Sequence, residues 1–202
     1  MEYSKEESRF SYYATRILSL DDECLLNPER TSELVEQIFE LNARAHDPIM
    51  LIVNSNGGPM TQTFLVIDVI RSIASPVHTQ IMGVAASAGC FIAMCGAPGG
   101  RYASSLSRIM LHQPQIVGEM HGDATQMAIE QREVSRLKSQ LLDLTADATG
   151  RTGDRRAISQ LKRDMERDRW FSPVEAVEYG LVDHIGISPL LSEMPVPPLE
   201  VA

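Results

Sequence analysis

A run of small residues between two apolar stretches constrains this chain more than any other feature. Gly83–Gly89, with the sequence GVAASAG, follows the apolar stretch Val77–Met82 and precedes the apolar stretch Cys90–Cys95. This pattern predicts a buried strand, a tight turn and a helix that starts with Ser87. The glycines and alanines also leave room for another backbone to approach closely.

Ser87 has two interpretations. At the first turn of a helix, free backbone N–H groups and the positive dipole end can stabilise the negative charge that develops during attack by a serine. The stretch Ala85–Gly89 is close to the G-x-S-x-G turn that exposes a nucleophilic serine between a strand and a helix. Serine is also a preferred N-cap, so this stretch taken alone favours a structural cap.

The first half of the chain alternates strands and helices. The continuous apolar run Ile49–Val53 is typical of a strand buried on both faces, and strands are also expected at about 16–20 and 77–82. Helices are expected from Pro28 and over about 60–73. Right-handed crossovers then predict an α/β fold with a largely parallel sheet. The loops at one sheet edge would bring Gly57–Gly58 near Ser87.

The second half delivers a histidine and a long helix. An apolar strand over Ser107–Leu111 ends at His112, and a helix is expected from about Asp123 to Ala148. A helix of this length is expected to project from the body as a bundle arm or an oligomer contact. Further elements are expected as a helix over about 154–165, a helix that starts at Ser172–Pro173, and a last strand over 181–185.

Composition limits the function classes. The 202 residues are 44% hydrophobic and 22% charged, as in globular proteins, and the formal net charge of −9 argues against nucleic acid as the main partner. The three cysteines form no CxxC pair, and no apolar run approaches the roughly 18 residues that span a bilayer. We therefore expect a cytoplasmic protein. We expect an N-terminal arm over 1–15, one domain over 16–187 and a Pro-rich tail over 188–202.

A serine nucleophile needs a general base, and the base needs an acceptor that orients it. His112 is the best placed of the five histidines, although a lone histidine more often has a structural role. For the acid, Asp168 lies beside Trp170, which could shelter it, but spacing alone leaves Asp164 and Asp183 open. No set of residues has the spacing of a metal site.

These segments together resemble the Clp protease proteolytic subunit family (ClpP), which are serine peptidases of the ClpP/crotonase fold. The resemblance runs from about Arg16 to Ile185. The motifs that carry it are Asn54–Gly58, Met82–Gly89, Ser107–Pro114 and Glu166–Asp183. It implies an α/β spiral of repeated β-β-α and βαβ units with a projecting handle helix over about 115–150.

The resemblance also implies the site. It makes Ser87 the nucleophile, His112 the general base and Asp168 the orienting acid, with the backbone N–H groups of Gly58 and Ala88 as the oxyanion hole. The implied activity is serine endopeptidase cleavage of unfolded proteins inside a barrel-shaped oligomer. It implies no cofactor and no metal in this chain, because the partner unfoldase uses the ATP.

The implied partners are other ClpP-type subunits in two stacked heptameric rings, fed by an AAA+ unfoldase such as ClpX, ClpA or ClpC. By likeness the rings meet along the handle, Glu166 and Arg167 bridge them, and 115–122 lies beside the extended substrate. The chain departs from the family at the unfoldase docking positions, which are Met50, Ile52 and Ser72. A mixed ring with a second ClpP-type subunit that supplies the docking face is therefore an alternative.

Two other functions remain open on sequence grounds. The first is a weakly active or structural subunit of a hetero-oligomeric ring, which would not need the set Ser87, His112 and Asp168. The second is an acyl-CoA enzyme of the crotonase branch, which shares the fold and a Gly-rich oxyanion loop but needs no such set.

Overall fold

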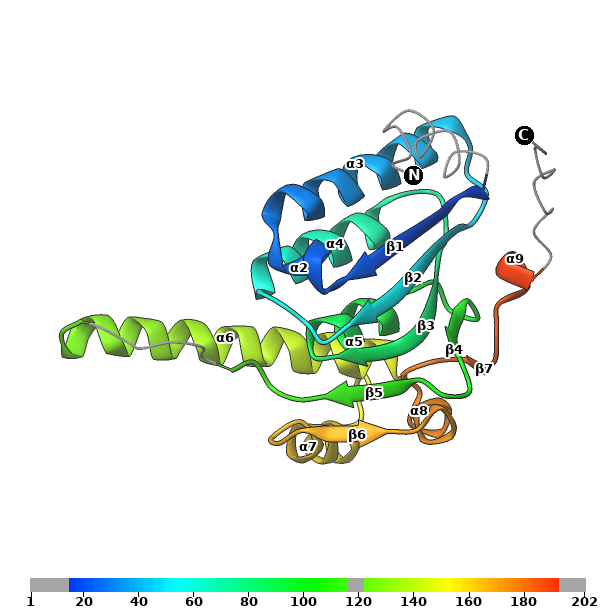
Figure 1. Ribbon diagram of the computed structural model, residues 1–202. Coiled ribbons are helices and arrows are strands. Elements are labelled where there is room, and N and C mark those ends of the chain that lie inside the picture. Colours follow the sequence, from blue (N-terminus) through cyan, green and yellow to red (C-terminus); the bar gives the residue numbers. More distant parts are fainter. Residues whose placement is uncertain (1–14, 116–121, 193–202) are drawn as a thin grey trace, which may run out of the picture.

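The strand that was predicted before Ser87 is β3 (Val77–Ala86), and it lies at the centre of the sheet. The computed structural model describes residues 15–115 and 122–192, and within these ranges it has one seven-stranded sheet with helices packed around it (Figure 1). The other strands are β1 (Ile17–Asp21), β2 (Ile49–Ser55), β4 (Arg101–Ala103), β5 (Arg108–Leu111), β6 (Arg169–Phe171) and β7 (His184–Ile185). The helices are α2 (Asp22–Leu26), α3 (Pro28–Arg44), α4 (Met60–Ser72), α5 (Ala88–Met94), α6 (Ala124–Ala148), α7 (Arg155–Asp164), α8 (Pro173–Tyr179) and α9 (Pro189–Ser192).

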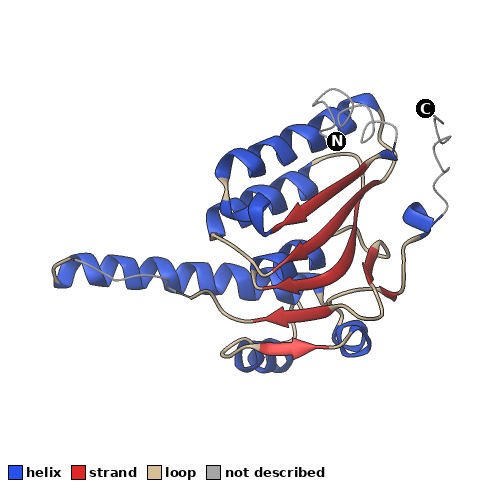
Figure 2. Ribbon diagram, in the orientation of Figure 1, coloured by secondary structure: helices blue, strands red, loops and turns tan. Residues whose placement is uncertain are grey.

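The sheet is parallel except at one edge, and it divides at β3. The strands β1, β2, β3, β4 and β7 pair in that order and all run parallel. Residues Thr79–Ile81 of β3 pair with β4, whereas Val84–Ala86 pair with β5, and β6 adds antiparallel to β5 (Figure 2). The predicted α/β fold with a largely parallel sheet is confirmed. The division places β5 directly beside the strand that ends at Ser87.

The core follows from the apolar patterns. Ile49, Leu51 and Val53 on one face of β2 are fully buried, and on the other face Met50 is buried and Ile52 is half-buried, so both faces are covered. Helix α3 begins where expected, because Pro28 occupies its first turn and the side chain of Asn27 accepts a hydrogen bond from the Glu29 N–H at 2.9 Å.

Three local predictions were wrong. The expected turn over 83–86 is part of β3, and the turn is confined to Ser87. Within the strand, Gly83 has a φ of 86° and lies in close contact with the side chain of Asn54. The last strand is only His184–Ile185, since the N–H groups of Leu181 and Val182 donate to the Ala176 carbonyl at the end of α8 instead of to a neighbouring strand. No strand was predicted in the charged run Glu166–Arg169 or in the two aromatic residues after it, but Arg169–Phe171 form β6.

Helix α6 projects from the body, as predicted (Figure 1). Its buried residues are Leu141, Thr145 and Ala146, all near its C-terminal end. The arm over 1–15 lies outside the described residues except for Thr15, and so do 116–121 of the substrate-flanking segment and 193–202 of the tail. The described start of that tail is ordered, because the buried Ser188 donates its N–H to Gln80 at 2.8 Å. None of the helices in the described ranges combines the length and hydropathy needed to cross a membrane.

Candidate active site

Ser87 lies at the junction of β3 and α5 in a strained backbone conformation. Its φ is 53° and its ψ is −119°, an arrangement that L-residues seldom adopt and that concentrates at functional sites. The backbone N–H of Ser87 donates to the Met110 carbonyl of β5 at 3.0 Å, which fixes the turn against the neighbouring strand. Although Ser87 is at the N-cap position of α5, its side chain makes no capping hydrogen bond. The structural-cap interpretation is therefore wrong.

The imidazole of His112 lies between the serine and a carboxylate. His112 follows the last residue of β5 and is 8% exposed. Its Nε2 lies 2.7 Å from Ser87 Oγ, and its Nδ1 lies 3.1 Å from Asp168 Oδ1. A proton on Nδ1, donated to Asp168, leaves Nε2 free to accept the proton of the serine hydroxyl.

The structure selects one acid from the three that spacing left open. Asp164 accepts a hydrogen bond from the Tyr179 hydroxyl at 2.7 Å and pairs with Arg169. Asp183 pairs with Arg101. Burial raises the pKa of each carboxyl, but hydrogen bonds to Tyr179 and to Arg101, respectively, outweigh it and lower both pKa values. Asp168 is the one of the three that contacts the imidazole.

The shelter expected from Trp170 is absent in the single chain. The Asp168 side chain is 54% exposed and Trp170 is 46% exposed. Trp170 pairs with Met110 across the β5–β6 ladder, and the Arg108 guanidinium lies 5.5 Å from its ring centroid. An exposed carboxylate holds an imidazole weakly, because water competes for both partners. The site in one isolated chain is thus open on its acid side.

The Gly57–Gly58 loop lies against Ser87, as predicted from the topology. A Cβ atom built on Gly57 would lie 2.8 Å from Ser87 Cβ and 3.1 Å from the Ala88 nitrogen, so only glycine permits this contact. Gly57 also has a φ of 117°, which disfavours any other residue. Gly58 packs on Leu25 of α2, where a built Cβ would lie 2.9 Å from the leucine Cβ.

Asp22, which the sequence analysis missed, organises this loop. One carboxylate oxygen accepts from Ser55 Oγ at 2.8 Å and from the Asn56 N–H at 2.6 Å, and the other accepts from the Asn56 amide at 2.8 Å. The Gly57 N–H in turn donates to Ser55 Oγ at 3.0 Å. Burial raises the pKa of Asp22, but the hydrogen bonds from Asn56 and Ser55 outweigh it and lower the pKa.

Gln115 is a second residue that the sequence analysis missed. Its side-chain nitrogen Nε2 lies 3.2 Å from His112 Nδ1, the nitrogen that also faces Asp168, and the oxygen and nitrogen of such an amide are interchangeable by a 180° turn. With a proton on Nδ1, the Gln115 amide must present its oxygen rather than its nitrogen to the ring. The spacing of three residues from His112 was the available signal, but glutamines are too common for it to be specific.

The cysteines take no part in this arrangement. Burial raises the pKa of the Cys24 thiol to about 11 and of the Cys90 and Cys95 thiols to about 12. All three are therefore neutral thiols at physiological pH and poor nucleophiles. In the described ranges, no three His, Cys, Asp or Glu side chains are grouped so that they could hold a metal ion.

A hydroxyl, an imidazole and a carboxylate in this order form the arrangement that serine peptidases of several unrelated folds share. The family model described as Clp protease matches residues 5–188 of the chain. The chain therefore belongs to the Clp protease family, a family of proteases.

Curated relatives agree with this assignment. The chain is 41% identical to ATP-dependent Clp protease proteolytic subunit 1 of Chlamydia muridarum over 155 aligned residues. This alignment covers 76% of this chain and 78% of the relative. It is 34% identical to the subunit 1 of Protochlamydia amoebophila over 76% of this chain and 73% of the relative. It is 38% identical to ATP-dependent Clp protease proteolytic subunit 2 of Cutibacterium acnes over 87% of this chain and 79% of the relative.

Proposed function

We propose that this chain is a serine endopeptidase subunit that cleaves unfolded proteins through Ser87, His112 and Asp168. The observation that carries the proposal is the 2.7 Å distance from His112 Nε2 to Ser87 Oγ, at a serine whose side chain caps no helix. Membership of the Clp protease family supports the same chemistry. A purely structural subunit would not need this strained serine beside an oriented imidazole.

The reaction proceeds in two halves. Ser87 Oγ attacks the peptide carbonyl while His112 Nε2 takes the hydroxyl proton, and Asp168 stabilises the imidazolium that forms. His112 then gives that proton to the leaving amine, which departs and leaves an acyl-serine. A water molecule, deprotonated by the same nitrogen, hydrolyses the ester and restores Ser87.

The oxyanion of each tetrahedral intermediate is assigned to the backbone N–H groups of Gly58 and Ala88. Ala88 is the first residue of α5, where an N–H group lacks a partner within the helix. The close approach of the Gly57–Gly58 loop to Ser87 supports a second donor from this loop. Such fixed donors stabilise the transition state without reorganisation. No cofactor or metal enters these steps.

Assembly is the second part of the proposal. The chain would act in the cytoplasm in stacked heptameric rings with other ClpP-type subunits, fed by an AAA+ unfoldase. The open acid side of the site supports a role for a neighbouring subunit in completing it. Large apolar side chains that are exposed in the single chain also favour assembly, and they include Leu26, Phe39, Leu65, Met127 and Ile129.

The residues at the docking positions disfavour a standard unfoldase contact. Of the positions that the resemblance assigns to docking, Met50 is 1% exposed and Ser72 is a small polar residue. A mixed ring, in which a second subunit type supplies the docking face, fits these residues better than a ring of this chain alone.

The test combines size with peptide cleavage. The purified chain, alone and mixed with a second ClpP-type subunit, is sized by analytical ultracentrifugation and assayed with fluorogenic peptides. We expect a ring-sized particle that cleaves peptides, and a Ser87→Ala particle of the same size that does not. Equal cleavage by wild type and Ser87→Ala would refute the proposal.

A further inference from the structure

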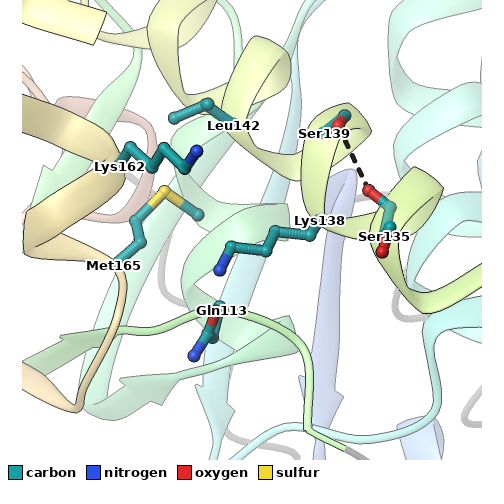
Figure 3. A pocket seen from close by; sticks show the side chains of 7 residues that line it. All are labelled: Gln113, Ser135, Lys138, Ser139, Leu142, Lys162 and Met165. Carbon is teal, nitrogen blue, oxygen red and sulfur yellow. Dashed lines mark hydrogen bonds between the residues drawn. The ribbon is translucent and has the colours of Figure 1, made fainter. Parts of the chain in front are cut away.

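A cavity of about 270 Å³ lies between α6, α7 and the residue that follows His112. Figure 3 shows the side chains of Lys138 from α6 and Lys162 from α7 extending into the same space. Gln113 and Met165 lie beside the two lysines (Figure 3). The remaining lining residues are Ser135, Ser139 and Leu142.

The cavity shares its walls with the candidate active site. The Gln113 N–H donates to the Met165 carbonyl at 2.6 Å, and the Gln113 side chain donates to the Glu166 carbonyl at 3.0 Å. These bonds join the backbone just after His112 to the backbone just before Asp168. The cavity therefore borders the two segments that hold the base and the acid in place.

The charge of the cavity is unbalanced. Lys138 and Lys162 are two of only three lysines in the chain, which otherwise uses arginine for its positive charge. In the described ranges no ion pair includes either ammonium group. Of the acids near them in sequence, Glu133 pairs with Arg136 and Asp164 pairs with Arg169, while no ion pair in the described ranges joins Asp143 or Glu166 to either lysine. Two unpaired ammonium groups that face one space attract an anion.

The size and lining favour a carboxylate on a short apolar stem. The volume falls below the roughly 300–1,000 Å³ of pockets that enclose whole small molecules, so a single side chain is the better fit. The buried Met165 and the half-buried Leu142 offer apolar contact to methylene groups. The side-chain amide of Gln113 supplies a further polar group at the rim.

From these observations we infer that the cavity binds an acidic side chain of the substrate close to the cleaved bond, and that Lys138 and Lys162 determine this specificity. The inference rests on the proposed function, since it names a substrate class for that site. Successive residues of an extended peptide are about 3.3 Å apart. Gln113 directly follows His112, whose Nε2 lies 2.7 Å from Ser87 Oγ, so the cavity is close enough to receive a side chain within a few residues of the cleaved carbonyl.

Cleavage of matched peptides tests the specificity. The assembled particle is given peptides that differ only by Glu or Gln at each position near the cleaved bond. At one position we expect kcat/KM to be about tenfold higher for the Glu peptide than for the Gln peptide. Each of Lys138→Gln and Lys162→Gln is expected to reduce this ratio about threefold, the size of effect that a partly exposed ion pair has. Arg136→Gln, which removes a charge from the same helix outside the cavity, leaves the preference unchanged.

Charge reversal sharpens the test. In the double variant Lys138→Glu, Lys162→Glu, we expect the preference to move from Glu to Lys at the same position. Equal kcat/KM for Glu and Gln at every position in wild type, with peptides cleaved, overturns the inference and leaves the proposed function intact.

A binding measurement decides the case in which no peptide is cleaved. In the assembled Ser87→Ala particle, a fluorescent Glu peptide is expected to bind about tenfold more tightly than its Gln counterpart, and Lys138→Gln with Lys162→Gln to abolish the difference. Failure of cleavage with this binding difference present refutes the proposed chemistry but supports the cavity. Equal binding of the two peptides overturns the inference.

Lysine reactivity identifies the occupant. An amine-acylating reagent, followed by mass spectrometry, is expected to modify Lys138 and Lys162 in the assembled particle. The Glu peptide is expected to protect both lysines, whereas its Gln counterpart protects them much less. If both lysines are already protected in the assembled particle without peptide, a second copy of the chain fills the cavity and the inference is wrong.

Discussion

The contact between Gly57 and Ser87 makes Gly57→Ala a demanding test of the site. The new Cβ would lie 2.8 Å from Ser87 Cβ, whereas ordinary contact begins at 3.4 Å, so the two must separate by at least about 0.6 Å. The other near atoms are the Ala86 carbonyl and the Ala88 nitrogen, which are backbone and cannot rotate away. Ser87 must therefore move relative to His112.

The expected effects on stability and activity can be separated. A side chain at a φ of 117° is strained by about 1–3 kcal/mol, which for a chain of this size lowers the Tm by several degrees, at about 2–4 °C per kcal/mol. A misplacement of about 1 Å reduces catalysis about 10²-fold. We therefore expect kcat for a fluorogenic peptide to fall between about 10- and 100-fold, with KM less affected.

Gly186→Ala is the matched control. Gly186 has a φ of 119°, but a Cβ built there meets no atom within 4 Å. We expect a similar loss of Tm in differential scanning calorimetry and an unchanged kcat. Wild-type kcat in Gly57→Ala, or an equal loss of kcat in Gly186→Ala, would refute the reasoning that contact with Ser87 constrains the site.

Three further substitutions test contacts described above, and a fourth, Arg167→Ala, tests the proposed bridge between rings. Asp168→Asn favours the wrong imidazole tautomer, so kcat/KM should fall by about 10²–10⁴-fold with assembly unchanged, as peptide assays and sizing can check. Arg167→Ala should reduce both assembly in sedimentation velocity and peptidase activity, if this residue bridges rings. Asp183→Ala leaves the nearly buried Arg101 unpaired and should lower the free energy of unfolding in urea by about 3–5 kcal/mol. The pKa of Asp22 is lowered in the folded chain, so the stability that its carboxylate contributes is present above about pH 4 and is lost as the pH falls through the folded pKa. The Tm of wild type should therefore exceed that of Asp22→Asn at neutral pH, and the difference should shrink below about pH 4.

Each of these has a clear contrary result. Undiminished kcat/KM in Asp168→Asn would show that the acid is elsewhere. An Arg167→Ala variant that is fully assembled and fully active would refute the bridging role. An unfolding free energy of Asp183→Ala within 1 kcal/mol of wild type, or a Tm difference for Asp22→Asn that is constant with pH, would contradict the corresponding contact.

Much of the fold could be predicted because local signals and topology agree. Asn27 and Pro28 begin α3, and the capping box at Ser172 begins α8, since each of these ends is determined by neighbouring residues. The proximity of Ser87 to the Gly57–Gly58 loop followed from parallel strands sharing an edge. These features need no knowledge of distant side chains.

The choice of the acid could not be predicted from the residues alone. Which of Asp164, Asp168 and Asp183 faces the imidazole depends on the tertiary partners that occupy the other two, Tyr179 and Arg101. The role of Asp22 was hidden for the same reason, because its partners lie 33 and 34 positions away. The length of β3 was missed because its glycine resembles a turn residue but serves a close approach to Asn54.

The exposure of Asp168 was a failure of a different kind. The neighbouring Trp170 was expected to cover it, yet Trp170 lies opposite Met110 in the β5–β6 ladder and beside the Arg108 guanidinium, and Asp168 remains 54% exposed. A strand within the charged run was not expected, and without it the direction of Trp170 could not be known.

The central claim is that the Ser87 hydroxyl is activated by His112, and covalent labelling measures this most directly. A fluorophosphonate probe is incubated with the assembled particle, and the modified residue is located by mass spectrometry. We expect stoichiometric labelling at Ser87, none in Ser87→Ala and a large loss of labelling rate in His112→Ala. Labelling that is absent from Ser87, or that proceeds at the same rate without His112, would contradict it.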